Sequence, residues 1–228
     1  VAATSVAMGP RGLSLGVATP WGPGEVDTGV VGAFNVSNLL ATLGALLASD
    51  VGLERALDAL SRVAPPPGRM ERHGGGGRPL VVIDYAHTPD ALEKVLVAMR
   101  PAVAEGCDLV CVFGCGGDRD PGKRPVMGRV AAELADRVVV TTDNPRFEDP
   151  ASIAGAVAKG IVESGQRHWL LELDRAAAIE AAVRAAKPGD VVVVAGKGHE
   201  TYQEVGGERR PFSDAQAVDE ALASRGPA

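Results

Sequence analysis

Four consecutive residues, Asp143, Asn144, Pro145 and Arg146, bring both signs of charge and an amide into one turn of this chain. The turn follows a strand-like run at residues 138–142. In open α/β sheets, ligands bind where the strands end. Pro145 fixes its own φ and restricts Asn144, so the turn is stiff and its side chains are aimed. The turn is therefore a candidate binding site for a charged ligand. A polar loop that caps the next helix is the plain alternative.

Two arginines and a glutamate at other predicted strand ends could bind charged groups. The guanidinium groups of Arg119 and Arg146 each offer a planar pair of donors that suits a carboxylate. The alternative for each arginine is a structural ion pair with Asp118 or Asp143. Glu200 could receive an ammonium group, and its alternative role is that of a solvated turn residue. Polar loops follow five predicted strands, which predicts a site for a charged small molecule at one edge of the sheet.

A glycine-rich loop with basic neighbours follows the strand-like run at residues 109–113. It leads from a strand toward a helix and so resembles an anion-binding cradle. It lacks the Gly-Lys-Ser/Thr ending of a P-loop and the glycine spacing of a dinucleotide-binding motif. His87 and His199 could act as general bases, although hydrogen-bonded loop histidines are commoner. We find no nucleophile elbow and no metal-ligand cluster, so we assign no catalytic residue and no metal ligand.

The three cysteines of the chain, Cys107, Cys111 and Cys115, are spaced by four residues. An odd number at this spacing is no disulfide framework. The segment 109–113 reads as a buried strand, on which this spacing does not suit a closed tetrahedral metal site. We therefore predict that the cysteines act as small buried hydrophobic residues. We also predict that the protein lies in the reducing cytoplasm.

Composition narrows the class of protein. The chain has 228 residues, of which 46% are hydrophobic and 23% charged, with a formal net charge of −6. This balance is that of a globular protein of one or two domains, and it argues against a general nucleic-acid or anionic-membrane surface. We find no apolar run of membrane-spanning length and no signal-peptide pattern in the given sequence. Because the first residue is Val1, we expect a fragment or a processed chain.

The first third of the chain predicts a hairpin followed by two helices. Residues 12–18 and 25–31 are strand candidates separated by a turn-rich stretch. Leucines recur at helical spacing over residues 35–48, and a second helix is expected over 53–63. Asn35, Ser37 and Asn38 are placed to cap the first helix. Prolines 65–67 form a semi-rigid spacer, which sets the predicted domain boundary between residues 67 and 68.

The remainder alternates strands with helices, which predicts an α/β fold with a mostly parallel sheet covered on both faces. The strands read as unbroken apolar runs, as doubly buried strands should. A flexible loop is expected at residues 74–77 and a hairpin around 206–207. The predicted strands are 80–84, 109–113, 138–142, 169–172 and 191–195, and the predicted helices are 89–99, 125–134, 152–163, 175–186 and 214–223.

Six stretches taken together resemble the Mur ligases, most closely the members that add diaminopimelate. The resemblance covers nearly the whole chain in order, and it is most specific over residues 112–128 and 143–150. The stretches are FNVSN at 34–38, GRME at 68–71, VVIDYAHTPDALEKVL at 81–96, VFGCGGDRDPGKRPVMG at 112–128, DNPRFEDP at 143–150 and VAGKGHETYQ at 194–203.

Members of that family add an amino acid to a UDP-linked muramoyl peptide in peptidoglycan synthesis. ATP converts the peptide's terminal carboxylate to an acyl phosphate, which the incoming amino group attacks. The family has a UDP-binding domain, a central ATPase domain and a Rossmann-like C-terminal domain that delivers the amino acid. The resemblance implies that residues 1–67 are the C-terminal part of the α/β central domain. Residues 68–228 would be the whole C-terminal domain.

The resemblance also implies site residues. Asn35 and Asn38 match asparagines near adenine, Arg69 matches a linker arginine that reaches ATP phosphate, and Asp84 matches an aspartate near the ribose. Lysine-adding relatives differ from the DNPR signature at the arginine. The residues that match contacts to meso-diaminopimelate are Arg119, Asp143, Asn144, Pro145, Arg146, Gly196 and Glu200. No definite role is assigned to His87, Lys123, Arg124 or His199.

One departure from the family pattern is large. The chain has no G-T-N-G-K-T/S loop, and the family's Mg²⁺-binding residues and carbamylated lysine lie upstream of its first residue. We therefore expect ATP and Mg²⁺ to be held by the full-length parent and not by this fragment, which we expect to be inactive alone. The implied partners are the missing N-terminal part, meso-diaminopimelate, ATP and the UDP-muramoyl dipeptide, with no nucleic acid and no membrane insertion. The alternatives are a non-catalytic binding module or a Mur-type ligase for another amino acid such as L-lysine or glutamate.

Overall fold

The computed structural model of the chain describes residues 1–9 and 12–225. The chain divides into two compact units, Val1–Pro65 and Pro66–Ala228, and each is described by itself. The division lies two residues before the boundary expected from the prolines. None of the helices in the described ranges is long and apolar enough to cross a membrane.

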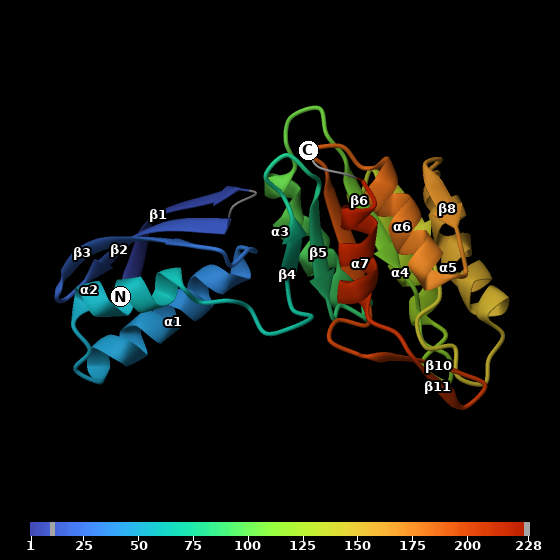
Figure 1. Cartoon of the computed structure of the whole chain (residues 1–228), viewed down its shortest axis with the longest axis horizontal. Helices are drawn as coiled ribbons and strands as arrows, with labels where there is room; N and C mark the ends of the chain where they lie inside the picture. The colour runs from blue at the N-terminus through green and yellow to red at the C-terminus, as the bar shows by residue number, and fades with distance from the viewer. Residues whose placement is uncertain (10–11, 226–228) are drawn as a thin grey trace. The chain divides into compact units, whose positions relative to one another are not determined.

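The first unit is a three-stranded antiparallel sheet with two helices packed on it (Figure 1). Its elements are β1 (Ala2–Gly9), β2 (Gly12–Thr19), β3 (Gly22–Thr28), α1 (Phe34–Ala48) and α2 (Leu53–Ser61). Alternate residues of β2, among them Leu13 and Leu15, bury against Leu39 and Leu43 of α1. The predicted hairpin and both helices are confirmed. Strand β1 was not predicted, because its residues are mostly small and exposed and give no run of large apolar side chains.

The predicted capping of α1 is wrong. The helix begins at Phe34, so its N-cap is Ala33, which makes no side-chain cap hydrogen bond. The Asn35 side chain therefore lies inside the first turn, where Nδ2 donates to the Val31 carbonyl at 2.7 Å. Asn38 Nδ2 in turn donates to Asn35 Oδ1 at 2.9 Å. The asparagines thus bond to each other and to the preceding loop, not to the free N–H groups of the helix.

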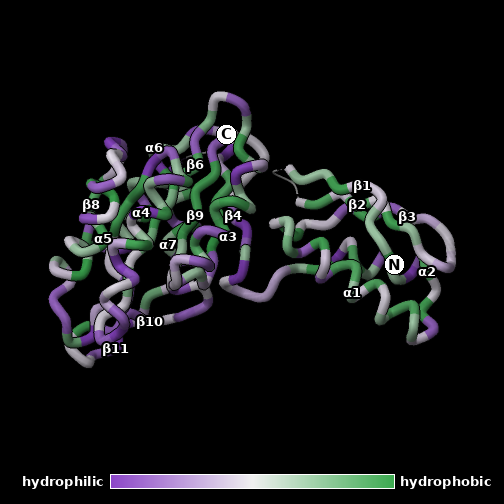
Figure 2. Tube along the Cα trace, turned by 180° about the vertical axis from the view of Figure 1, so that it is seen from behind, coloured by the Kyte–Doolittle hydropathy of each residue, from purple (hydrophilic) through white to green (hydrophobic). Residues whose placement is uncertain are grey.

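The second unit is a six-stranded sheet in the order β4-β5-β9-β6-β7-β8, with all but β4 parallel. Helices cover both faces: α6 and α7 pack on one, and α3, α4 and α5 on the other (Figure 1). Figure 2 shows hydrophobic residues along the central strands. The elements are β4 (Glu71–Gly74), β5 (Leu80–Asp84), α3 (Pro89–Met99), η1 (Arg100–Ala102), β6 (Leu109–Phe113), α4 (Lys123–Leu134), β7 (Arg137–Val140), α5 (Pro150–Ser164), β8 (Trp169–Leu171), α6 (Arg175–Ala185), β9 (Val191–Ala195), β10 (Tyr202–Val205), β11 (Glu208–Pro211) and α7 (Asp214–Ala223).

This α/β fold with a mostly parallel sheet confirms the predicted fold class. Strands β5, β6 and β9 are buried at every residue, as their apolar runs predict. Two edge strands differ from expectation. Leu170 and Leu171 of β8 are exposed, because β8 has a neighbour on one side only. Strand β4 was not predicted; it pairs antiparallel with β5, and its polar residues suit an edge position.

The three cysteines are free, and two of them are buried. Burial raises the pKa of the Cys111 thiol, which lies in β6. Burial also raises the pKa of the Cys115 thiol, to about 12. Cys107 is partly exposed, with Sγ 3.7 Å from the Pro188 carbonyl oxygen. In residues 1–9 and 12–225 there is no group of three or more His, Cys, Asp or Glu side chains that could hold a metal ion.

We expect one fast-reacting thiol in the native protein, because the thiolate is the nucleophile and only Cys107 is accessible. A colorimetric disulfide reagent at pH 8 should label Cys107 first and the other two only in denaturant, with the sites read by mass spectrometry. A Cys107→Ser variant should lose the fast phase. Rapid native labelling of Cys111 or Cys115 would contradict the burial described here.

Candidate functional site

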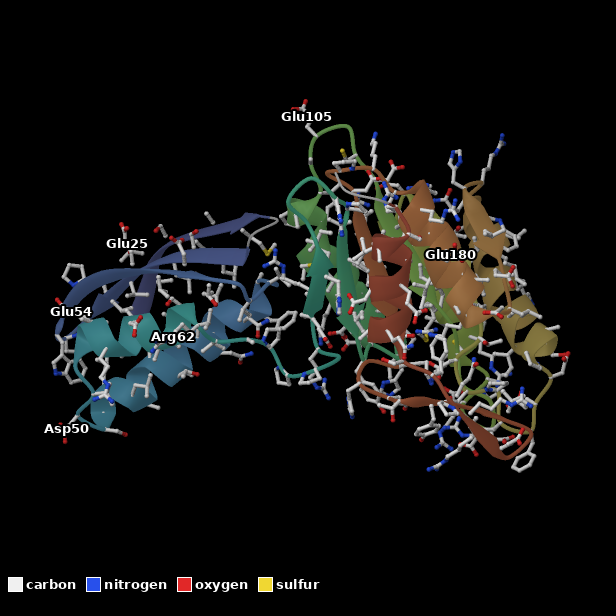
Figure 3. All side chains as sticks on the ribbon, viewed as in Figure 1. Glu25, Asp50, Glu54, Arg62, Glu105 and Glu180 are labelled. Carbon is white, nitrogen blue, oxygen red and sulfur yellow. The ribbon has the colours of Figure 1, made fainter. Side chains whose placement is uncertain are left out.

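The loops at the carboxyl ends of β6 and β7 are bonded to each other. Gly117 N donates to the Asn144 carbonyl at 2.9 Å, and Arg146 Nη1 donates to the Gly117 carbonyl at 2.7 Å. Phe147 N donates to Asp118 Oδ2 at 3.3 Å. These loops lie at the edge of the sheet opposite the loop of Glu105, which Figure 3 labels. Loops that were predicted only to share an edge are therefore one connected structure.

Glu148 fastens the same two loops through its carboxylate. Its Oε1 accepts a hydrogen bond from Asp118 N at 2.5 Å and another from Arg124 Nη2 at 2.8 Å. The Arg124 hydrogen bond, followed by that of Asp118 N, lowers the pKa of Glu148. The carboxylate therefore stays charged until the pH falls below its ordinary value of 4.5. Arg124, which had no predicted role, is buried and supports the loops from beneath.

The β10–β11 hairpin holds the loop of residues 143–148 from the other side. Arg146 N donates to the Glu204 carbonyl at 3.0 Å, and Gly206 N donates to the Arg146 carbonyl at 2.6 Å. Arg146 has φ of 53°, a left-handed conformation that a non-glycine residue adopts at some cost. These two backbone hydrogen bonds, which fix the residue on both sides, offset that cost.

The Arg146 side chain is part-buried and retains unused donors. Its Nη1 is engaged with Gly117, while its Nε lies 3.9 Å from Glu204 Oε2, beyond hydrogen-bond length. Its Nη2 has no hydrogen bond to any residue in the described part of the chain. The alternative of an ion pair with Asp143 is wrong, because Arg146 is directed to Gly117 and Glu204 instead. The guanidinium edge that includes Nη2 can therefore bind an anionic group.

Arg119 lies beside Arg146. A side-chain carbon placed on Gly116 would be 3.0 Å from Arg146 Nη1 and 3.9 Å from Arg119 Cγ, so both arginines border the same glycine. Arg119 is exposed and donates from Nη1 to the backbone carbonyl of Asp118 at 3.1 Å. The alternative of an ion pair with the Asp118 carboxylate is wrong, because within the described residues Arg119 bonds to the Asp118 carbonyl and forms no ion pair with that carboxylate, which accepts from Phe147 N.

Asp143 and Gly196 meet at the ends of β7 and β9. A side-chain carbon on Gly196 would lie 2.6 Å from Asp143 Oδ2, a contact that would force one of them to move. Gly196 also has φ of 117°, which other residues rarely adopt. Glycine at this position therefore lets the buried Asp143 carboxylate lie against the backbone of the loop that follows β9.

Asn144 and Glu200 contact each other directly through Asn144 Nδ2 and Glu200 Oε2, 2.7 Å apart. Asn144 is buried, so its side chain lies beneath the surface of the site. Lys197, which had no predicted role, is completely buried and donates to both residues. The only sequence signal for it is a lysine that stands between two glycines just after a buried strand.

Arg69 and Asp84 lie on the same edge. The Asp84 carboxylate accepts from Met70 N at 2.9 Å, and the Asp84 carbonyl accepts from Gly196 N at 3.1 Å. Burial raises the pKa of Asp84, against the opposing effects of backbone N–H groups and of Arg69. The Arg69 guanidinium is 5.6 Å from the centre of the Tyr85 ring. Asn35 and Asn38 belong to the first unit, whose placement relative to this edge is not determined.

Two histidines lie beside Tyr85, and a lysine bonds to the backbone of one of them. The ring of His87 lies 4.7 Å from that of Tyr85, and the ring of His199 lies 5.6 Å away on the loop that follows β9. Lys123 Nζ donates to the His87 carbonyl at 2.9 Å. These residues therefore belong to the part of the edge that adjoins Arg69.

A buried ion pair lies under the edge. Arg175 Nε and Nη2 donate to the two carboxylate oxygens of Asp214 at 2.7 and 2.8 Å, and both side chains are completely buried. The same guanidinium donates to the carbonyls of Thr142 and Ala195 at 3.1 and 3.0 Å. These carbonyls directly precede Asp143 and Gly196. Arg175 is the first residue of α6, and its burial makes it a support for the loops of the edge.

The sequence of this chain also matches known proteins. The family model described as "Mur ligase, glutamate ligase domain" matches residues 68–198. The chain belongs to the Mur ligase family.

Individual Mur ligases resemble the chain over almost its whole length. A protein of Chromobacterium violaceum named UDP-N-acetylmuramoyl-L-alanyl-D-glutamate--2,6-diaminopimelate ligase is 54% identical over 216 residues, covering 95% of this chain and 43% of the relative. The protein of that name from Pseudomonas aeruginosa is 50% identical, covering 95% and 44%. A solved structure of a ligase with the same name has a TM-score of 0.78 at 39% identity, covering 99% of this chain and 46% of that chain. This Mur ligase chain thus spans somewhat under half the length of these relatives.

Proposed function

We propose that this chain supplies the amino-acid-binding part of an ATP-dependent ligase. The ligase adds meso-2,6-diaminopimelate to UDP-N-acetylmuramoyl-L-alanyl-D-glutamate in peptidoglycan synthesis. The observation that carries the proposal is the unused guanidinium edge of Arg146, held in a fixed loop beside Arg119. The names of the similar Mur ligases support the same substrate.

The charges of the site suit the charges of diaminopimelate. This amino acid is lysine with an additional carboxylate on its far carbon, and an arginine with free donors is the side chain that can read it. Arg146 and Arg119 bind that carboxylate. Glu200 and Asp143 bind ammonium, and the glycine at position 196 leaves room for close approach. The site therefore orients the substrate by both ends so that its reacting amine is presented in one direction.

The nucleotide is assigned to the adjoining part of the edge. Arg69 is exposed and lies next to Asp84, so these two residues fit a nucleotide's phosphate and ribose groups. Asn35 and Asn38 are proposed to face adenine. When bound, ATP supplies the phosphoryl group that activates the carboxylate of the UDP-linked substrate. We assign no Mg²⁺ ligand to the described residues, because they contain no suitable cluster. We place the reaction in the cytoplasm, where the free thiols stay reduced.

The proposal is tested by titrating the isotopically labelled chain with diaminopimelate, L-lysine and glutamate while its NMR spectrum is recorded. This method detects binding with dissociation constants as weak as millimolar. We expect diaminopimelate to shift the amide signals of the loops at 114–120, 143–148 and 196–200. We expect it to bind at least about 100-fold more tightly than L-lysine, since lysine leaves the arginine donors unpaired. Tighter binding of lysine or glutamate would identify a ligase for another amino acid. Binding of none of the three would favour a non-catalytic module.

A further inference from the structure

Lys197 is an unusual residue to bury. It lies one glycine beyond the end of β9, and its side chain has 0% exposure although it carries an ammonium group. Buried charges are retained where they are paired, since removing an ion from water is costly. Lys197 Nζ lies 3.0 Å from Glu200 Oε2 and 2.9 Å from Asn144 Oδ1, and it lies 5.7 Å from the centre of the Tyr202 ring. Its partners are therefore two residues of the proposed substrate site.

The three side chains form a closed triangle of hydrogen bonds. Lys197 donates to Asn144 and Glu200, and Asn144 Nδ2 donates to the same Glu200 Oε2 at 2.7 Å. Glu204 N also donates to Asn144 Oδ1, at 3.0 Å. Because Asn144 Oδ1 accepts two donors, the orientation of its amide is fixed and its Nδ2 must face Glu200. The triangle therefore sets the position of the Glu200 carboxylate from beneath.

The two oxygens of Glu200 differ in their bonding. Oε2 accepts both donors of the triangle, whereas Oε1 accepts no hydrogen bond from residues 1–9 or 12–225. The Glu200 side chain is 22% exposed, so its second oxygen is accessible from outside. One oxygen is thus anchored by the protein and the other is left for a ligand.

We propose that Lys197 is a positioning residue for the amino-acid substrate, holding Glu200 so that Oε1 receives one ammonium group of diaminopimelate. The proposal rests on the proposed function of the site. Lys197 does not touch the substrate; it acts through Glu200 and Asn144. Without its ammonium, Glu200 loses one of its two anchors, and Asn144 loses one of the two donors that fix its amide. The site would then still bind the carboxylate end of the ligand, but it would bind the ammonium group more weakly.

The test uses Lys197→Met in the 228-residue chain, with two ligands that differ by one amine. L-2-Aminopimelate keeps both carboxylates of diaminopimelate and lacks one of its amines. NMR titration should show diaminopimelate affinity falling by at least about tenfold, the range for a lost charged hydrogen bond. The affinity for 2-aminopimelate should change by less than about twofold. Lys187→Met, which removes an exposed lysine in the loop before β9, is the matched control and should change neither affinity.

Other results overturn the proposal. Equal weakening of both ligands, or no weakening, would mean that Lys197 does not act through the amine. Lys197→Gln, which keeps an N–H donor, is used if the methionine variant fails to fold, and unfolding of both variants would show a purely structural role. If the unaltered chain binds no diaminopimelate, the proposed function fails together with this inference. If the unaltered chain binds it and Lys197→Met binds it equally, only this inference fails.

Discussion

Replacing Arg146 with alanine should abolish most of the preference for diaminopimelate over lysine. In the proposed function, the arginine's unused donors bind the far carboxylate of diaminopimelate, which lysine lacks. A hydrogen bond to a charged group contributes about 1.5–3 kcal/mol, so loss of a two-donor contact should weaken diaminopimelate by roughly 100-fold or more. Lysine, which lacks the carboxylate, should bind about as before. NMR titration of both ligands measures the change in their ratio.

Two further variants make this result specific. Arg146→Lys keeps the positive charge but loses the planar pair of donors, and it should give an intermediate preference. Arg184→Ala removes an exposed arginine of α6 that pairs with Glu180, and it should leave both affinities unchanged. Arg146→Ala retains a side-chain carbon, so the unusual φ of 53° is equally demanding in the variant. A fall of equal size for lysine and diaminopimelate would show that Arg146 shapes the loop and does not read the carboxylate.

The sequence could predict which loops share this edge of the sheet, because each strand and the loop after it are recognised from a short continuous stretch. Apolar runs of five residues, each followed by a polar or glycine-rich loop, predicted β5, β6 and β9 and the loops after them. Parallel topology then requires those loops to share an edge. The pattern could not show which polar side chains would be buried and hydrogen-bonded within the protein, and which would remain free to bind a ligand. Asn144 and Arg146 are polar residues of the same predicted binding turn, yet the first is buried and the second keeps free donors.

Residues that act through tertiary contacts gave no readable signal. Arg124 and Glu148 are separated by 24 positions, and only the folded loops bring them to 2.8 Å. Edge strands β1 and β4 were missed because exposure removes the apolar pattern by which strands are recognised. The predicted start of α1 was one residue too late. Asn35 therefore lies inside the first turn and bonds to the Val31 carbonyl, although it was expected to cap the helix. Local pattern therefore predicts the architecture, and packing decides the chemistry of individual side chains.

The most destabilising single change that we expect outside the apolar core is Arg175→Met. The variant leaves the Asp214 carboxylate completely buried without its partner, and removing one member of a buried pair costs about 3–5 kcal/mol. The carbonyls of Thr142 and Ala195 also lose a donor. For a domain of this size, the midpoint of thermal unfolding should fall by roughly 10 °C. Differential scanning calorimetry and urea unfolding measure the loss.

A second substitution separates the cost of an unpaired charge from the value of the pair. Arg175→Met combined with Asp214→Leu removes both charges, and buried pairs replaced by apolar residues are often nearly neutral. The double variant should therefore be more stable than Arg175→Met alone, while the exposed control Arg184→Met changes stability by less than about 0.5 kcal/mol. Diaminopimelate binding should remain impaired in the double variant, because no donor then holds the carbonyls before Asp143 and Gly196. Recovery of stability together with full binding would show that the pair serves the fold alone.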